Sequence, residues 1–92
     1  MISKEYVINN PTGLHARPAS VLVETAKKFK SSITLECDGK KVNAKSVLKL
    51  MSGGITGGKT VNVVCDGEDE GELMAAVGEL FENNFNEGTG ES

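Results

Sequence analysis

His15, the only histidine of the chain, is the residue whose chemistry stands out first. Neutral imidazole is a competent nucleophile near neutral pH. A phosphoryl group held on a ring nitrogen also keeps a high transfer potential, because no strong bond to carbon or oxygen is formed. His15 stands in the run GLHARP at residues 13–18, between a turn-prone segment and the predicted start of a helix. This setting suits His15 to accepting a phosphoryl group and handing it on.

The neighbours of His15 suit that chemistry. A helix that starts at Ala16 presents unpaired backbone amides and the positive end of its dipole to a dianionic group beside it. The Arg17 guanidinium can reach the same oxygens and stabilise their charge during an in-line transfer. Gly13 permits a close approach of the loop, and the fixed φ of Pro18 suits the first turn of a helix. We therefore predict His15 as phosphoryl acceptor and donor, assisted by Arg17 and by the Ala16 amide.

Residue types alone leave other roles open for His15. The histidine could be an incidental surface residue or an accessory at the helix start. It could also bind a metal ion, but a metal site needs several ligands at suitable spacing. The chain has no second histidine, and both of its cysteines are expected inside the core. We therefore predict no metal site.

A glycine-rich segment at residues 53–60, GGITGGKT, fits the written pattern of a nucleotide-binding P-loop. A P-loop runs from a strand into a helix, whose first amides hold the phosphates. Here the segment runs from a predicted helix into a predicted strand, and the chain is too short for the parallel sheet of that fold. We interpret it as a flexible connection and predict that the protein uses no cofactor.

The pattern of apolar residues predicts the elements that position His15. Alternation predicts strands over 2–8, 32–37, 41–43 and 60–66. Helical spacing predicts helices over 16–29, 47–51 and 73–81, with Ser46 as the N-cap of the second helix. The order βαββαβα predicts an α+β open-faced sandwich, a four-stranded antiparallel sheet with helices on one face. The order of the strands within the sheet stays open.

Length and composition limit the possible classes of protein. With 92 residues the chain has room for one domain, which we place at 1–86, followed by a flexible tail at 87–92. Thirteen acidic and ten basic residues give a formal net charge of −3, which argues against nucleic-acid binding. No apolar run approaches the roughly 20 residues that cross a bilayer, and the first residues lack a secretory signal. We expect a cytoplasmic monomer without membrane insertion.

The two cysteines are expected to be structural. Cys37 and Cys65 share the phase of the apolar residues in two predicted strands. Free cysteine behaves as a small apolar residue, and disulfides are rare in the cytosol. We predict buried, reduced thiols.

Several motifs together resemble the HPr family, the phosphocarriers of the bacterial phosphoenolpyruvate-dependent sugar phosphotransferase system. They are GLHARPA at residues 13–19, AKS at 44–46 and MS at 51–52, and the order of strands and helices agrees. The resemblance implies that His15 receives its phosphoryl group from enzyme I and gives it to the IIA components of sugar permeases, with Arg17 assisting. It implies a phosphoryl carrier rather than a stand-alone turnover enzyme.

The same resemblance implies a regulatory site at Ser46. An ATP-dependent kinase/phosphorylase would phosphorylate this residue, and the modified form would bind a catabolite-control repressor. Ser46 is also a good helix N-cap in its own right.

A docking surface for these partners is predicted near His15. A short helix cannot bury both of its faces, so part of its apolar surface is expected to be exposed. The apolar residues of this surface are Leu14, Val47, Leu48 and Met51. Basic residues around it would attract acidic partners; they are Arg17, Lys27, Lys45 and Lys49. Many family members carry Gly at position 49 and Leu at position 53, so Lys49 and Gly53 are departures in this surface.

Two alternative hypotheses stay open. The chain could be a nitrogen-related or purely regulatory paralogue that does not serve sugar uptake, although Ser46 favours the sugar branch. It could also be a non-enzymatic interaction module with an incidental histidine. Incubation with enzyme I and phosphoenolpyruvate separates a carrier from such a module.

Overall fold

Strands and helices alternate along the chain in the predicted order. The structure, a computed structural model, describes residues 1–8 and 16–83. Within these ranges the elements are β1 (Ile2–Val7), α1 (Ala16–Ala26), β2 (Ser32–Cys37), β3 (Lys40–Asn43), α2 (Val47–Ser52), β4 (Thr60–Asp66) and α3 (Glu70–Glu82). The expected bounds of β2, β4 and the short helix α2 agree with the observed ones to within one residue.

The four strands form one antiparallel sheet with the order β1-β4-β2-β3. β4 lies between β1 and β2, where Val63 faces Lys4 on one side and Leu35 on the other. The side chains of β4 alternate, with Val61, Val63 and Cys65 buried. This period of two is what places one side of each strand against the core.

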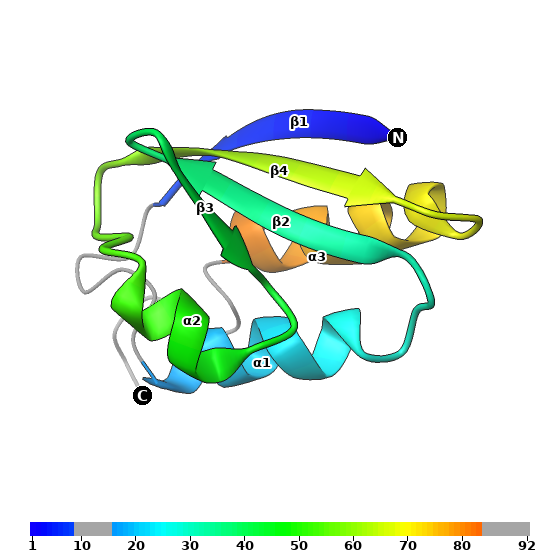
Figure 1. Cartoon of the computed structure of the whole chain (residues 1–92), viewed down its shortest axis with the longest axis horizontal. Coiled ribbons are helices and arrows are strands. Elements are labelled where there is room, and N and C mark those ends of the chain that lie inside the picture. Colours follow the sequence, from blue (N-terminus) through cyan, green and yellow to red (C-terminus); the bar gives the residue numbers. More distant parts are fainter. Residues whose placement is uncertain (9–15, 84–92) are drawn as a thin grey trace.

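All three helices lie on the same side of the sheet (Figure 1). The core between the layers includes Leu22 from α1, Leu35 from β2 and Leu73 from α3, each with no exposed surface. The other face of the sheet has no helix in the described residues, and its side chains are polar or only partly buried. The predicted open-faced sandwich is therefore confirmed.

The two longer helices differ from their predicted bounds. The prediction that α1 runs to Phe29 is wrong, because the helix ends at Ala26 and continues as a tight turn. In that turn the amide of Phe29 donates to the carbonyl of Ala26 at 3.1 Å, three residues back. The Phe29 ring still packs against the core, which explains its helical spacing in the sequence. α3 begins before the predicted Leu73, because Glu70 and Glu72 in its first turn suit a helix start without adding apolar periodicity.

The predictions for the turn at Asp38 and Gly39 and for the two cysteines are confirmed. Asp38 and Gly39 between β2 and β3 have φ of 54° and 81°, as a two-residue hairpin turn with positive φ at both positions requires. Cys37 and Cys65 are both buried and free. In the described residues, no helix is long and apolar enough to span a membrane.

Candidate functional site

The start of α1 is the described part of the predicted phosphorylation site. His15 itself, together with Gly13 and Leu14, lies outside the described residues. α1 begins at Ala16, directly after His15 in the chain, as predicted. The first amides of a helix have no helical partner, so those of Ala16 and Arg17 are free of the helix's own hydrogen bonds. The first turn carries no acidic residue that would oppose an anion there.

Two neighbouring residues in that turn point to opposite environments. Pro18 is among the fully buried side chains, so it anchors the first turn in the core. Arg17 is exposed, and within the described part of the chain no carboxylate forms an ion pair with it. An anchored helix start and an available guanidinium are together suited to binding a phosphoryl group.

Ser46 is the N-cap of α2, as predicted. Its backbone is extended, with φ of −129° and ψ of 117°, and its Oγ accepts a hydrogen bond from the amide of Lys49 at 3.3 Å. Its carbonyl accepts the first helical bond, from the Leu50 amide at 3.0 Å. The hydroxyl that would receive a phosphate therefore already holds an orphan amide of the helix.

The helix α2 divides its apolar residues between the core and the surface. Leu50 is fully buried, whereas the side chains of Leu48 and Met51 are 80% and 47% exposed. Val47 is partly buried and packs against the core. The structure thus shows an exposed apolar patch at Leu48 and Met51, to which Val47 contributes little. Leu14, the fourth predicted member, lies outside the described residues.

Charges of opposite sign occupy different parts of the fold. From α1 through the following turn the charged residues are all basic except Glu24, and α2 with the residue pair before it adds Lys45 and Lys49. From residue 66 to the end of α3 every charged residue is acidic. The α1 and α2 side is therefore the side that would attract acidic partners, although the net charge is negative.

The lysines predicted for the docking surface differ in the hydrogen bonds and ion pairs that they form. Lys27 and Lys49 are exposed, and neither forms an ion pair within residues 1–8 and 16–83. Lys45 is only partly exposed, and its Nζ donates to the carbonyl of Phe29 at 2.9 Å. Its ammonium thus has an internal bond that the sequence pattern did not indicate.

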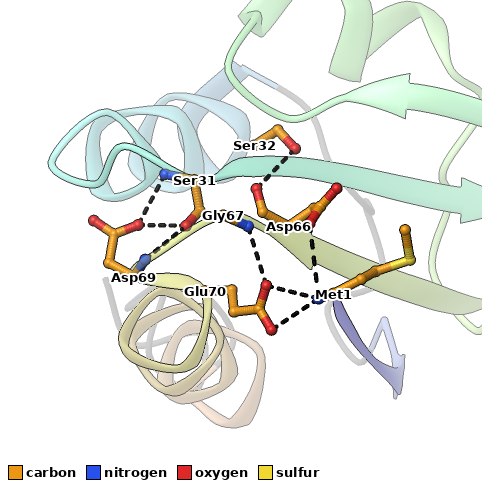
Figure 2. A network of polar contacts seen from close by, with 7 residues as sticks. All are labelled: Met1, Ser31, Ser32, Asp66, Gly67, Asp69 and Glu70. Carbon is orange, nitrogen blue, oxygen red and sulfur yellow. Dashed lines mark hydrogen bonds and ion pairs between the residues drawn. The ribbon is translucent and has the colours of Figure 1, made fainter.

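Asp69, at the start of α3, is bonded to the end of the turn that leads from α1 into β2 (Figure 2). Its carboxylate accepts hydrogen bonds from the amides of Lys30 at 2.9 Å and Ser31 at 2.8 Å, and from the Ser31 hydroxyl. These bonds, with that from the Ser31 hydroxyl first in size, lower the pKa of Asp69 to about 2. Ser31 is 2% exposed, so this network ties the residues just before β2 to the start of α3 inside the fold.

Glu70, beside Asp69, makes a second link in the same region (Figure 2). Its carboxylate lies 2.8 Å from the terminal ammonium of Met1 and accepts a hydrogen bond from the Gly67 amide at 3.0 Å. The ammonium group lowers the pKa of Glu70. These contacts tie the start of β1 to the start of α3.

Of the two departures from the family pattern, Lys49 and Gly53, the structure explains Gly53. A Cβ built at this position would lie 2.7 Å from Cγ2 of Val42, closer than side chains pack. Val42 is buried on β3, so the end of α2 approaches that strand closely. A leucine at position 53 would need Val42 or α2 to shift.

The glycine-rich segment has the predicted order of helix, loop and strand. It leads from α2 into β4, the reverse of a P-loop. The Lys59 ammonium is paired with the Asp38 carboxylate and lies 3.5 Å from the Gly54 carbonyl. This lysine therefore serves to join the segment to the β2–β3 turn.

Comparisons with known proteins agree with this fold. The family model described as "PTS HPr component phosphorylation site" matches residues 2–83. A phosphocarrier protein HPr of Xylella fastidiosa strain 9a5c is 46% identical over 89 residues, which cover 97% of this chain and all of that protein. The crystal structure of HPr-C-His from Thermoanaerobacter tengcongensis is 47% identical with a TM-score of 0.90, covering 95% of this chain and 98% of the other.

A third structure bears on assembly. The crystal structure of an HPr dimer, also from Thermoanaerobacter tengcongensis, is 50% identical with a TM-score of 0.73, and covers 85% of this chain and 90% of that chain. Its name states that this relative forms a dimer.

The fold, the start of α1 and the family match define a small phosphoryl carrier with an open-faced sandwich fold. The chain belongs to the HPr family, the phosphocarriers of the phosphotransferase system.

Proposed function

We propose that the protein works in the cytoplasm as the phosphoryl relay of sugar uptake, taking a phosphoryl group from enzyme I on His15 and passing it to IIA components. The observation that carries the proposal is the start of α1. The helix begins directly after His15, its first turn has no acidic residue, and Arg17 is exposed there. Within residues 1–8 and 16–83 the Arg17 guanidinium forms no ion pair, and it lies two positions after the one histidine in the sequence.

The transfer moves one phosphoryl group through two displacements. In the first, a neutral imidazole nitrogen of His15 attacks phosphorus, and the bond between phosphorus and the donor group of enzyme I breaks. In the second, a nucleophile on the IIA component attacks, and the bond to His15 breaks. The amides of Ala16 and Arg17 and the Arg17 guanidinium stabilise the oxygens in both steps.

The relay is tested by following a labelled phosphoryl group from phosphoenolpyruvate through enzyme I and this protein to a IIA component. Arg17→Ala should slow charging about tenfold or more without loss of folding, because the guanidinium is exposed and acts on the transferred charge. Arg17→Lys keeps the charge but not the bidentate geometry and should be intermediate. An alanine variant that charges at the wild-type rate would remove Arg17 from the mechanism.

The proposal includes a docking surface on the α1 and α2 side. Leu48 and Met51 supply its exposed apolar area, and Arg17, Lys27 and Lys49 its positive charge. Acidic partners would be steered to this side, which adjoins the start of α1. Each partner would use the same surface in turn, as a relay requires.

We further propose that Ser46 is a regulatory phosphorylation site for an ATP-dependent kinase/phosphorylase, and that the modified form is read by a catabolite-control repressor. Ser46 stands at the start of α2, two positions before the exposed Leu48. A phosphate there would add about two negative charges to a surface that attracts acidic partners, and would slow charging by enzyme I. It would not unfold α2, because a negative group suits a helix start.

Ser46→Asp and Ser52→Asp form a matched pair for this claim. Both add one negative charge to α2, the first at its N-cap and the second at its last residue. Ser46→Asp should keep the melting temperature and slow charging of His15, whereas Ser52→Asp should lower the melting temperature, because it places a negative charge at the helix C-terminus. Unchanged charging in Ser46→Asp would refute the regulatory role.

The working unit in this proposal is a monomer, because the docking surface must be open to successive partners. A related protein crystallised as a dimer, so the test is the oligomeric state of this chain in solution. Sedimentation equilibrium at the concentrations used for charging measures it, and a dimer that charges without dissociating would overturn the monomer proposal.

A further inference from the structure

Lys45, at the junction between β3 and α2, forms hydrogen bonds through both its backbone amide and its side-chain ammonium. Its backbone amide donates to Oδ1 of Asn43 at 2.9 Å, and its Nζ donates to the carbonyl of Phe29 at 2.9 Å. Phe29 lies in the turn that follows α1, so the ammonium joins that turn to the residue before the Ser46 cap. The two segments are 16 residues apart in sequence.

This bond differs from an exposed ion pair. The hydrogen bond from Lys45 is partly buried, and its acceptor belongs to a residue whose ring packs against the core. Hydrogen bonds from a charged donor are stronger than neutral ones, and partial burial reduces competition from water. The Phe29 carbonyl is therefore a fixed anchor, and Lys45 is the side chain that uses it.

Lys49 provides the contrast on the same helix. It is exposed, and within the described part of the chain its Nζ makes no hydrogen bond or ion pair. Both lysines precede or occupy α2, and both carry one positive charge. Of these two lysines, only Lys45 bonds through its ammonium to another described residue.

We propose that Lys45 is a positioning residue for the docking surface. Its ammonium fixes the start of α2 against the end of α1, so that Leu48, Met51 and the Ser46 hydroxyl keep one position relative to the α1 helix. Lys45 thus acts on partner binding through geometry, and Lys49 through charge. This inference rests on the proposed function, because it explains how that surface is held.

The test compares Lys45→Met with Lys49→Met in charging by enzyme I, with the KM for the carrier measured from low to high salt. Both variants keep an unbranched side chain and lose the ammonium. Lys49→Met should raise KM at low salt only and converge on wild type at high salt, because exposed charges are screened. Lys45→Met should raise KM about threefold or more at every salt concentration, since a misplaced surface is not repaired by screening. Lys45→Arg, which keeps a donor, should recover most of the loss.

A second readout does not depend on any partner. The amides of Lys49 and Leu50 bond to Ser46, so their hydrogen exchange reports on the start of α2. Lys45→Met should speed their exchange about tenfold, the equivalent of one charged hydrogen bond, and Lys49→Met should leave that of Leu50 unchanged.

Two results would overturn the proposal. One is convergence of Lys45→Met with wild type at high salt, which would make Lys45 a charge offered to partners. The other is unchanged exchange at Leu50. If enzyme I fails to charge even the wild-type protein, the proposed function fails, while the exchange measurement still decides whether Lys45 positions α2.

Discussion

Leu48 and Leu50 lie two positions apart on α2 and are expected to respond to truncation in opposite ways. Leu50 is fully buried, and Leu48 is 80% exposed. Leu50→Ala should therefore lower stability by about 2–5 kcal/mol, through lost burial and the cavity it leaves. In a domain of this size that corresponds to a fall of about 10 °C or more in melting temperature. Leu48→Ala should change stability by less than about 0.5 kcal/mol, because the side chain is already in water.

The effect on docking should be the reverse. Full burial of a leucine contributes about 1.5–3 kcal/mol. With four fifths of Leu48 available for burial by a partner, its truncation should weaken docking by about 1–2 kcal/mol, or roughly five- to thirtyfold in KM.

Two assays separate these effects: thermal unfolding of the protein alone, and the KM for the carrier in charging by enzyme I. Leu50→Ala should raise KM only as far as it unfolds the protein at the assay temperature. The reasoning fails if Leu48→Ala melts well below wild type. It also fails if that variant charges with an unchanged KM, because the exposed patch would then not be a docking surface.

Three further changes test the supports of the site. Asp69→Asn should destabilise the fold near neutral pH, because the new side-chain NH₂ group would face the Lys30 amide. The pKa of Asp69 is lowered from 3.8 to about 2, so the stability advantage of the wild type should be complete above pH 4 to 5 and vanish as the pH falls towards 2. Unfolding midpoints measured at each pH check this. Gly53→Leu should cost about 1–3 kcal/mol by overpacking against Val42, and Val42→Ala should relieve that cost in a double-mutant cycle. Cys65, which has no exposed surface and whose pKa is raised to about 11 by burial, should react with a thiol reagent only when the protein unfolds; rapid labelling of the native protein would contradict its burial.

Much of the fold could be predicted because the relevant signals are local. The alternation of apolar and polar residues over 60–66 predicts β4, and a serine before a short apolar run predicts the helix N-cap at Ser46. The Asp38 and Gly39 pair likewise specifies its turn from two residues alone. Each of these patterns lies within a few positions of the element that it determines.

The features that escaped prediction join segments far apart in sequence. Strand order depends on which strands meet, and periodicity within one strand carries no such information. The bonds from Ser31 to Asp69 span 38 residues, and that from Lys45 to Phe29 spans 16. The predicted length of α1 was wrong for a related reason, because Phe29 reaches the core from a turn.

The central claim is that His15 carries the phosphoryl group. It is tested most directly by incubating the protein with enzyme I and phosphoenolpyruvate, measuring its intact mass, and locating the modified residue by fragmentation at neutral or mildly alkaline pH. One acid-labile phosphoryl group on His15, absent from His15→Ala, is the expected result. A phosphate on any other residue, or an alanine variant that still charges at the wild-type rate, would contradict the account.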